Sequence, residues 1–265
     1  MTKLNVALTI AGTDPTGGAG IMADLKSFQA RSVYGMAVVT SVLAQNTTGV
    51  QAICNLDLEI LEEQLKSVFS DITPDAIKTG MLAQVDTIEL VTAYLSKQDC
   101  PYVLDPVMVA TSGDPLIEEA AVQALKTKLL PLATLITPNL PEAEVLVGKK
   151  LETEGEILAA GSFIQKQYGV KNIVIKGGHL SGQAVDYLFL ENGELKTFSS
   201  NRIITKHTHG TGCTYAAVIT AELAKGASVE KAVRTAKCFI TEAIKTAPEL
   251  GKGHGPVNHT TYKGD

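Results

Sequence analysis

The chain has 265 residues, of which 45% are hydrophobic and 19% are charged, and its formal net charge is −5. A chain of this length forms one large α/β domain or two small ones, with a sizeable core. Because nucleic acids and anionic membranes attract basic surfaces, the acidic balance argues against both as partners. A small anionic ligand in a local pocket remains compatible with it.

Cysteine usage and the N-terminus indicate a cytoplasmic protein. The four cysteines form no CxxC pair, so neither a zinc site nor a disulfide framework is predicted; they are Cys54, Cys100, Cys213 and Cys238. No signal-peptide core precedes the first strand-like segment, and no apolar run reaches membrane-spanning length.

A unit of strand, polar strand end and helix repeats along the chain. Apolar and β-branched runs predict strands at residues 6–11, 36–43, 75–79, 102–104, 133–137 and 173–176. Helical spacing predicts helices at about 21–28, 58–68, 87–96, 118–130, 154–167, 215–224 and 229–246. Asn192-Gly193 is the strongest hairpin signal, so one antiparallel excursion is expected. No linker or repeat divides the chain, which predicts a single doubly wound α/β domain over residues 1–265, with a polar surface tail from residue 251.

Two glycine-rich loops each precede a helix. Residues 12–20 fit neither GxGxxG nor a P-loop, and they are typical of a loop that lines a substrate pocket. Residues 208–214 open an Ala-rich helix, where glycine lets a ligand approach the backbone and free N–H groups attract an anion. An ordinary glycine turn with a small buried cysteine remains the alternative for this stretch alone.

Residues at or near the ends of several expected strands should converge on one edge of the sheet. The set comprises Gly12, Asp24, Gln45, Met81, Asp105, Asn139, Glu142, Lys176 and residues 210–213. Any one of these residues could be structural; Glu142, for example, could simply stabilise a helix N-terminus after the expected N-cap Asn139. Together they provide an anion site, carboxylates for Mg²⁺, a lysine for phosphate charge and amides for a heterocycle, which favours phosphoryl transfer.

Two histidines near the second loop suggest other chemistries. His207 and His209 have no third ligand for a metal. His209 with Cys213 could suggest a cysteine hydrolase, but no orienting third group is identifiable.

Eight ordered motifs resemble the hydroxymethylpyrimidine/phosphomethylpyrimidine kinase family of thiamine biosynthesis, in the ribokinase-like superfamily. They are LTIAGTDPTGGAGIMADLKSF, VTSVLAQNTTGV, DAIKTGMLA, YVLDPVMVATSGD, LITPNLPEAEVL, IVIKGGH, HTHGTGCTYAA and GHGPVNH. The resemblance implies a three-layer α/β/α fold with a mostly parallel sheet, usually in a homodimer. It also implies ATP and Mg²⁺, which together phosphorylate a hydroxymethyl group and then the resulting monophosphate.

Carried over by motif, the resemblance also implies residue roles. The pyrimidine pocket would comprise Gly12, Asp24, Gln45, Met81, Val107 and Cys213. Asp105 and Glu142 would serve Mg²⁺, whereas Asn139, Lys176 and Thr208 would lie near the ATP phosphates. Gly210, Thr211, Gly212 and Cys213 would form the catalytic anion loop, with His209 beside it.

Two positions depart from the wider pattern. The anion loop ends in Cys213 where the superfamily has an aspartate base, so its thiolate would need stabilising by the helix N-terminus or by His209. Thr111 stands where many relatives have a lysine, which puts any lid-lysine role in doubt.

Two other functions stay open. Pyridoxal kinases share most of these motifs but tend to carry Met-Asp where this chain has Gln45-Asn46. A catalytically silent ligand sensor is the other alternative, and the complete set of acidic residues and lysine argues against it.

Overall fold

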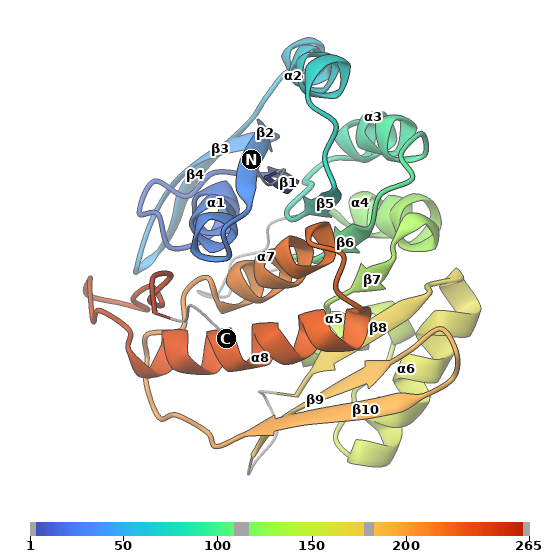
Figure 1. The fold of residues 1–265 in the computed structure, drawn as a ribbon, viewed down its shortest axis with the longest axis vertical. Coiled ribbons are helices and arrows are strands. Elements are labelled where there is room, and N and C mark those ends of the chain that lie inside the picture. The colour runs from blue at the N-terminus through green and yellow to red at the C-terminus, as the bar shows by residue number, and fades with distance from the viewer. Residues whose placement is uncertain (1–3, 109–116, 178–182, 262–265) are drawn as a thin grey trace.

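An eight-stranded sheet organises the computed structural model, which describes residues 4–108, 117–177 and 183–261 (Figure 1). The strand order is β10-β9-β8-β7-β6-β5-β1-β2, and the six strands from β8 to β2 run parallel. Their bounds are β1 Val6–Ala11, β2 Tyr34–Val39, β5 Ala76–Thr79, β6 Tyr102–Leu104, β7 Leu135–Ile136, β8 Asn172–Lys176, β9 Ala184–Phe189 and β10 Leu195–Ser200. The predicted fold class is confirmed.

Helices cover both faces of this sheet (Figure 1). Their bounds are α1 Gly20–Ala30, α2 Leu58–Asp71, α3 Val85–Leu95, α4 Glu119–Ala124, α5 Leu140–Val147, α6 Glu154–Tyr168, α7 Thr211–Ala224 and α8 Val229–Lys245. Successive strand residues pack on opposite faces: Leu8 and Ile10 join the core under α2 to α6, whereas Ala7 joins the core with α1, α7 and α8. Residues 214–224 of α7 are all buried, because this helix lies between the sheet and α8.

The single buried strand predicted at residues 36–43 is wrong. The chain turns at Thr40, and β3 (Ser41–Asn46) leaves the sheet to pair antiparallel with β4 (Gly49–Asn55). The Gln64 side chain of α2 binds both the N–H and the carbonyl of Val39, and the Thr40 carbonyl accepts the returning Leu56 N–H at 3.0 Å. These bonds use the backbone groups that a longer β2 would need. Strand β4 was not predicted because its residues 51–54 are exposed and lack a strand's apolar alternation.

The hairpin predicted around Asn192-Gly193 is confirmed as β9 and β10, and β9 also pairs antiparallel with β8. The helix predicted at 118–130 is less regular than expected. α4 passes into a π-helical turn at Leu125–Leu129 and a 3₁₀ turn at Leu130–Leu132, where Pro131 supplies no N–H.

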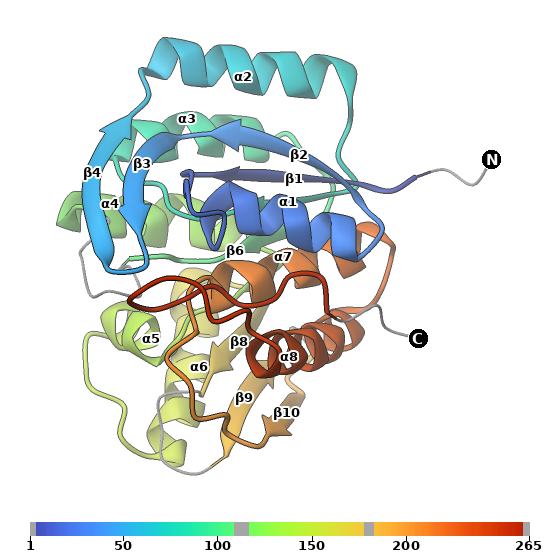
Figure 2. The ribbon, with the colours of Figure 1, turned by 90° about the vertical axis from the view of Figure 1, so that its left-hand side faces the viewer.

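The C-terminal segment corrects the prediction of a surface tail. The His254 N–H donates to the Thr47 carbonyl at 2.8 Å, so the segment returns to the tip of the β3–β4 hairpin (Figure 2). Val257 and His259 are buried. Within residues 4–108, 117–177 and 183–261, no helix is both long and apolar enough to cross a bilayer.

Candidate active site

A cavity of about 630 Å³ lies at the carboxyl ends of β1, β5, β6 and β8, between the first turn of α7 and the β3–β4 hairpin. The structure brings all but one of the predicted site residues to its wall: Gly12, Gln45, Met81, Asp105, Val107, Asn139, Glu142, Lys176, Thr208, His209, Gly210, Thr211, Gly212 and Cys213. Asp24 does not line the cavity. Parallel strands carry their polar ends to one edge, which explains the convergence.

The predicted anion loop is the first turn of α7. Gly210 caps the helix with φ +81°, a left-handed conformation that favours glycine, and α7 starts at Thr211 rather than after the loop. The Thr214 N–H already donates to the Gly210 carbonyl at 2.9 Å. The Thr211 N–H donates to the Thr208 carbonyl at 3.3 Å. The other amides of a first turn have no carbonyl one turn back, so this wall of the cavity suits an anion.

Asp24 pairs with a lysine that the sequence analysis did not select. Lys78 Nζ lies 2.9 Å from Asp24 Oδ2, both side chains are 0% exposed, and the Thr9 hydroxyl donates to the same oxygen at 2.6 Å. Burial opposes a charge on Lys78, but the Asp24 carboxylate raises its pKa, so it remains an ammonium. Lys78 lines the cavity and Asp24 lies behind it. A lysine within the buried run 76–79 was the available sequence signal.

A second lysine–carboxylate pair stands on the other side of α7. Lys176 Nζ lies 3.4 Å from Asp105 Oδ1, which also accepts a hydrogen bond from the Thr137 hydroxyl at 2.9 Å. A Cβ added to Gly212 would contact Lys176 Nζ at 3.5 Å and Asp105 Oδ2 at 3.7 Å, so the anion loop lies directly beside this pair.

Glu142 joins the same wall through a helix cap. Asn139 Oδ1 accepts the Glu142 N–H at 2.9 Å, and Glu142 Oε2 accepts the Asn139 N–H at 2.8 Å. The expected N-cap is confirmed, and this carboxylate has the structural role that was weighed for it. Burial and the charge of Asp105 raise the pKa of Glu142 to about 7, against the opposing charge of Lys176.

The thiol of Cys213 lies between the two pairs. Burial raises its pKa to about 12, although Lys78 opposes the shift; Asp24 and Asp105 add to it. The thiol therefore stays protonated at neutral pH, and the sequence-based idea of a stabilised thiolate finds no support in these surroundings.

One wall of the cavity is apolar and close-packed. A Cβ at Gly12 would meet Met81 Cε at 2.9 Å and Leu43 Cδ1 at 3.1 Å. Gln45 lies two residues after Leu43 within β3, rather than beyond the end of the strand predicted at residues 36–43. The wall can contact the face of a small ring, with one amide at its edge.

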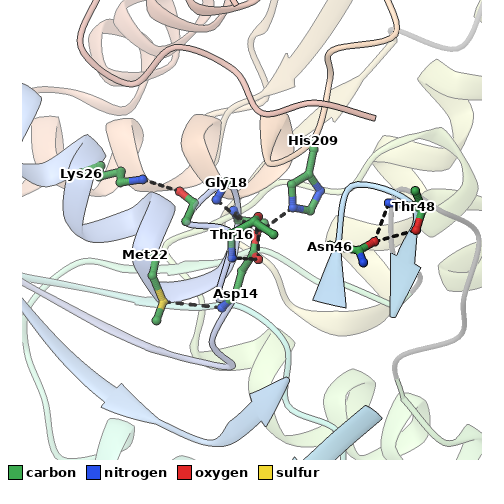
Figure 3. Close-up of polar contacts among 10 residues, drawn as sticks. Asp14, Thr16, Gly18, Met22, Lys26, Asn46, Thr48 and His209 are labelled. Carbon is green, nitrogen blue, oxygen red and sulfur yellow. Dashed lines mark hydrogen bonds and ion pairs between the residues drawn. The ribbon is translucent and has the colours of Figure 1, made fainter. Parts of the chain in front are cut away.

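His209 does not contact Cys213 in the way considered from the sequence. Its Nε2 lies 2.7 Å from Asp14 Oδ2, in the first glycine-rich loop (Figure 3). Among the residues described by the structure, no group of three His, Cys, Asp or Glu side chains could hold a metal ion.

The far end of the cavity contains residues that the sequence analysis missed. Asp186 of β9 and Lys237 of α8 form a buried ion pair at 3.1 Å. Apolar side chains of α8 continue the wall there, among them Ile240 and Ile244. These residues lie in a hairpin strand and a helix stripe, which from sequence alone are typical of core.

The Mg²⁺ site predicted from the sequence can be tested against the two carboxylates. Among the residues that the structure describes, Asp105 Oδ2 is buried without a hydrogen-bond partner, and Asp105 and Glu142 both line the cavity. Mg²⁺ is commonly bound by one or two carboxylates together with substrate phosphates, so the lack of a three-residue cluster is no obstacle. The residues fit such an ion. Thr111 lies outside the described residues.

Comparison with known proteins identifies the family. The model of the phosphomethylpyrimidine kinase family matches residues 14–258. The chain belongs to this family. A hydroxymethylpyrimidine/phosphomethylpyrimidine kinase of Staphylococcus aureus is 56% identical over 99% of this chain and 96% of its own length.

Solved structures agree with this assignment of the family. A phosphomethylpyrimidine kinase of Clostridium difficile has 42% identity and a TM-score of 0.80, covering 91% of this chain and 100% of its own. An ADP complex of Bacillus subtilis pyridoxal kinase has 42% identity and a TM-score of 0.90, covering 98% of each chain. The phosphomethylpyrimidine kinase family therefore shares its fold with pyridoxal kinases, and the chain is a phosphotransferase.

Proposed function

We propose that this chain uses ATP to phosphorylate 4-amino-5-hydroxymethyl-2-methylpyrimidine and then its monophosphate, in thiamine biosynthesis. One observation carries the proposal. A single cavity joins an apolar wall with one amide, at Gly12, Met81 and Gln45, to an anion loop flanked by Lys78 and Lys176. A small heteroaromatic alcohol and a phosphoryl donor can meet there, with Cys213 between them.

The residues divide into those that bind the ring and those that bind phosphate. Gln45 can both donate to and accept from an aminopyrimidine edge. The amides of Gly210 to Cys213 and the Lys176 ammonium can stabilise charge on the transferring phosphoryl group. Because the Cys213 thiol is protonated, it cannot take the hydroxyl proton as a base, and it acts by orienting the hydroxyl group of the substrate.

Asp105 and Glu142 would hold Mg²⁺, which neutralises charge on the phosphates when bound. Lys176 lies 3.4 Å from Asp105, so its ammonium would add a second positive charge beside the phosphates. Asn139 fixes Glu142 through the helix cap, so the carboxylate cannot rotate freely.

A substrate panel with ATP and Mg²⁺ tests the proposal. We expect phosphorylation of hydroxymethylpyrimidine and of its monophosphate in preference to pyridoxal. Replacing Gln45 with methionine should cost about 1–3 kcal/mol of pyrimidine recognition, because polar ring atoms lose their partner. An unchanged kcat/KM for hydroxymethylpyrimidine in Gln45→Met would remove Gln45 from ring recognition.

Pyridoxal phosphorylation is the second candidate, because the Bacillus subtilis pyridoxal kinase matches 98% of this chain at 42% identity. Gln45-Asn46 is the feature that separates the two substrates, since related pyridoxal kinases tend to carry Met-Asp there. If pyridoxal is the better substrate of the parent chain, this second candidate replaces the first. If no pyrimidine and no pyridoxal leads to ATP consumption, the remaining alternative is that the chain is a ligand sensor without catalytic activity.

A homodimer is also part of the proposal. The outward face of the β3–β4 hairpin exposes Val42 (48%), whose partner across the hairpin is the exposed Cys54 of β4. Leu58 and Ile60, at the start of α2, are also exposed apolar side chains. A two-stranded sheet alone is marginally stable, so a second copy covering it would stabilise the hairpin. Sedimentation should find a dimer that Val42→Asp weakens; a monomeric parent at micromolar concentration would contradict it.

We also propose a cytoplasmic location. All four cysteines are free thiols, and Cys54 and Cys238 are exposed. Exposed thiols persist where the compartment is reducing. Fractionation of the native cells, with immunodetection of the chain, is the direct test.

A further inference from the structure

The carboxylate of Asp14 collects more hydrogen bonds than the other side chains around the cavity for which contacts are described, yet it does not line the cavity (Figure 3). Its Oδ1 accepts the N–H and the hydroxyl of Thr16 at 2.9 and 2.8 Å. Its Oδ2 accepts the N–H groups of Gly18 and Ala19 at 3.2 and 2.8 Å. The side chain is 0% exposed, so the first glycine-rich loop is folded around this one anion.

The fifth donor to this carboxylate comes from a distant part of the chain. His209 Nε2 lies 2.7 Å from Asp14 Oδ2, across 195 positions of sequence. Burial raises the pKa of Asp14, but the hydrogen bonds from His209, Gln45 and Thr16 outweigh it and hold the pKa well below its usual range. An ionised carboxylate can only accept, so Nε2 carries the proton.

The imidazole of His209 is fixed from both sides. A Cβ at Gly18 would meet His209 Cδ2 at 2.7 Å and Pro256 Cβ at 2.9 Å, so the loop and the C-terminal segment enclose the ring. The His209 N–H donates to the Gly255 carbonyl at 3.0 Å, and its own carbonyl accepts the Val257 N–H at 3.3 Å. His209 therefore has little freedom to swing toward Cys213.

These contacts close a ring of interactions around the cavity mouth. The same C-terminal segment binds Thr47 at the hairpin tip, through the N–H groups of His254 and Gly253 at 2.8 and 3.1 Å. Gln45 lies two residues before Thr47, and its side chain helps to hold the pKa of Asp14 low. Hairpin, first loop, anion loop and C-terminal segment are thus tied to one another.

We propose that Asp14 and His209 form a positioning pair that fixes the distance between the ring-binding wall and the anion loop. The inference rests on the proposed function, because it gives the pair the task of aligning the substrate hydroxyl with the phosphoryl donor. Gly210 directly follows His209, and a Cβ on Gly210 would overlap the Gly18 carbonyl, so the two loops touch at the backbone. A displaced imidazole moves the anion loop relative to Gly12 and Gln45.

The pair also orients the amide of Gln45. The Gln45 side chain helps to hold the pKa of Asp14 low, so its amide lies close to this carboxylate. An amide held there still has donor and acceptor groups for the edge of an aminopyrimidine. Neither Asp14 nor His209 needs to touch the substrate for this effect.

The test compares Asp14→Asn, His209→Leu and their double variant with the parent. Each single variant should lower kcat/KM for hydroxymethylpyrimidine by about 10- to 100-fold, as misalignment by about 1 Å does. The kcat/KM of the double variant should be within about threefold of that of the less active single variant, because both substitutions break the same interaction. ADP affinity, measured by calorimetry, should change by less than about threefold, since the loop amides remain.

Two further variants separate positioning from folding. His209→Gln retains an amide N–H able to reach Asp14 and should recover part of the rate lost in His209→Leu. Thr16→Ala is the matched control: it removes another hydrogen bond from the same carboxylate but leaves His209 in place, and kcat/KM should stay within about threefold of the parent. The proposed pair would be wrong if Thr16→Ala lowered kcat/KM as much as His209→Leu does, or if the losses of the two single variants multiplied in the double variant. It would also be wrong if the variants changed only the melting temperature and left kcat/KM unchanged.

A spectroscopic arm keeps the inference testable without turnover. Nitrogen-15 NMR of His209 should show a protonated Nε2 whose resonance shifts in Asp14→Asn. If Nε2 carries no proton, or if its resonance does not change in Asp14→Asn, the proposed pair is refuted even when the enzyme is active. Failure of the parent to phosphorylate hydroxymethylpyrimidine refutes the proposed function instead, and the NMR outcome still decides the contact.

Discussion

Two lysine–carboxylate pairs lie near the first turn of α7, and they differ in their exposure to solvent. Lys78 and Asp24 lie 2.9 Å apart with both side chains 0% exposed. Lys176 and Asp105 lie 3.4 Å apart, and 16% of the Lys176 side chain is exposed. Each carboxylate keeps one buried oxygen without a hydrogen-bond partner in the described structure, Asp24 Oδ1 and Asp105 Oδ2.

The difference suggests different work for the two pairs. A fully buried ion pair cannot separate without leaving an unpaired charge in the protein interior. Lys78 and Asp24 therefore stay paired and have a fixed position. A looser pair at a cavity wall can give up part of its contact to a phosphate or a cation. Residue type alone would rank the two pairs equally, whereas burial distinguishes them.

The largest expected effect is on stability at the fully buried pair. Lys78→Met should lower the free energy of unfolding by about 3–5 kcal/mol, because Asp24 would stay buried without its partner. Lys176→Met is the matched control and should cost less, and Asp24→Asn added to Lys78→Met should restore part of the loss. Urea denaturation gives the free energy of unfolding of the parent and the three variants. Equal losses of stability in Lys78→Met and Lys176→Met would show that the two pairs do not differ.

The next effect concerns Cys213, on which the charges of both pairs act. Cys213→Ala keeps the backbone of the anion loop but removes the thiol that orients the substrate hydroxyl, so turnover should fall by about 10²-fold. Cys213→Asp should recover part of the rate. Parental turnover in Cys213→Ala would make the thiol a space-filling part of the wall.

A reactivity measurement sharpens that prediction. Because the pKa of Cys213 is raised to about 12, its thiol should be alkylated by iodoacetamide more slowly than the exposed Cys54 and Cys238 between pH 7 and about 9. Mass spectrometry of timed digests ranks the three rates. Preferential labelling of Cys213 would show a thiolate and contradict the buried, protonated state.

At the looser pair, Lys176→Ala should affect phosphate and leave ring binding intact. We expect turnover to fall by about 10², since one charge that stabilises the transferring phosphoryl group is lost. Hydroxymethylpyrimidine affinity, measured by calorimetry, should be nearly unchanged. Loss of pyrimidine binding with normal ATP handling would assign Lys176 to the wrong side of the cavity.

The smallest effect is a pH dependence at Glu142. Its pKa is raised to about 7, so the carboxyl gains a proton as the pH falls through 7 and is then no longer an anionic ligand. The Mg²⁺ concentration needed for half-maximal rate should therefore rise below pH 7. Glu142→Gln should remove that rise, while phosphate ionisation of ATP remains common to both chains; identical profiles would exclude Glu142 from the metal site.

Local signals were enough for much of the fold. The apolar alternation of residues 6–11 predicts β1, Asn192-Gly193 predicts the β9–β10 turn, and Asn139 predicts the cap of α5. Each of these features depends on residues a few positions apart, so propensity and spacing carry the information. Polar residues that follow parallel strands also predicted most of the cavity wall, since topology brings such ends together.

Contacts between distant segments needed the tertiary structure. Lys78 meets Asp24 across 54 positions, and His209 meets Asp14 across 195. Nothing in the spacing of these residues says which carboxylate a lysine or imidazole will reach. Their burial, which sets the pKa of Cys213 and Glu142, likewise depends on what packs around them.

The sequence by itself therefore predicted most of the strands and helices, the glycine loop before α7 and the residue types around the cavity. Only the tertiary structure decided that β3 leaves the sheet at Thr40, that His209 turns to Asp14 and that the C-terminal segment ties the hairpin tip to the anion loop. Secondary structure follows from the short-range periodicity of the sequence. The pairing of buried charges and of strands depends instead on which distant residues the fold buries next to one another.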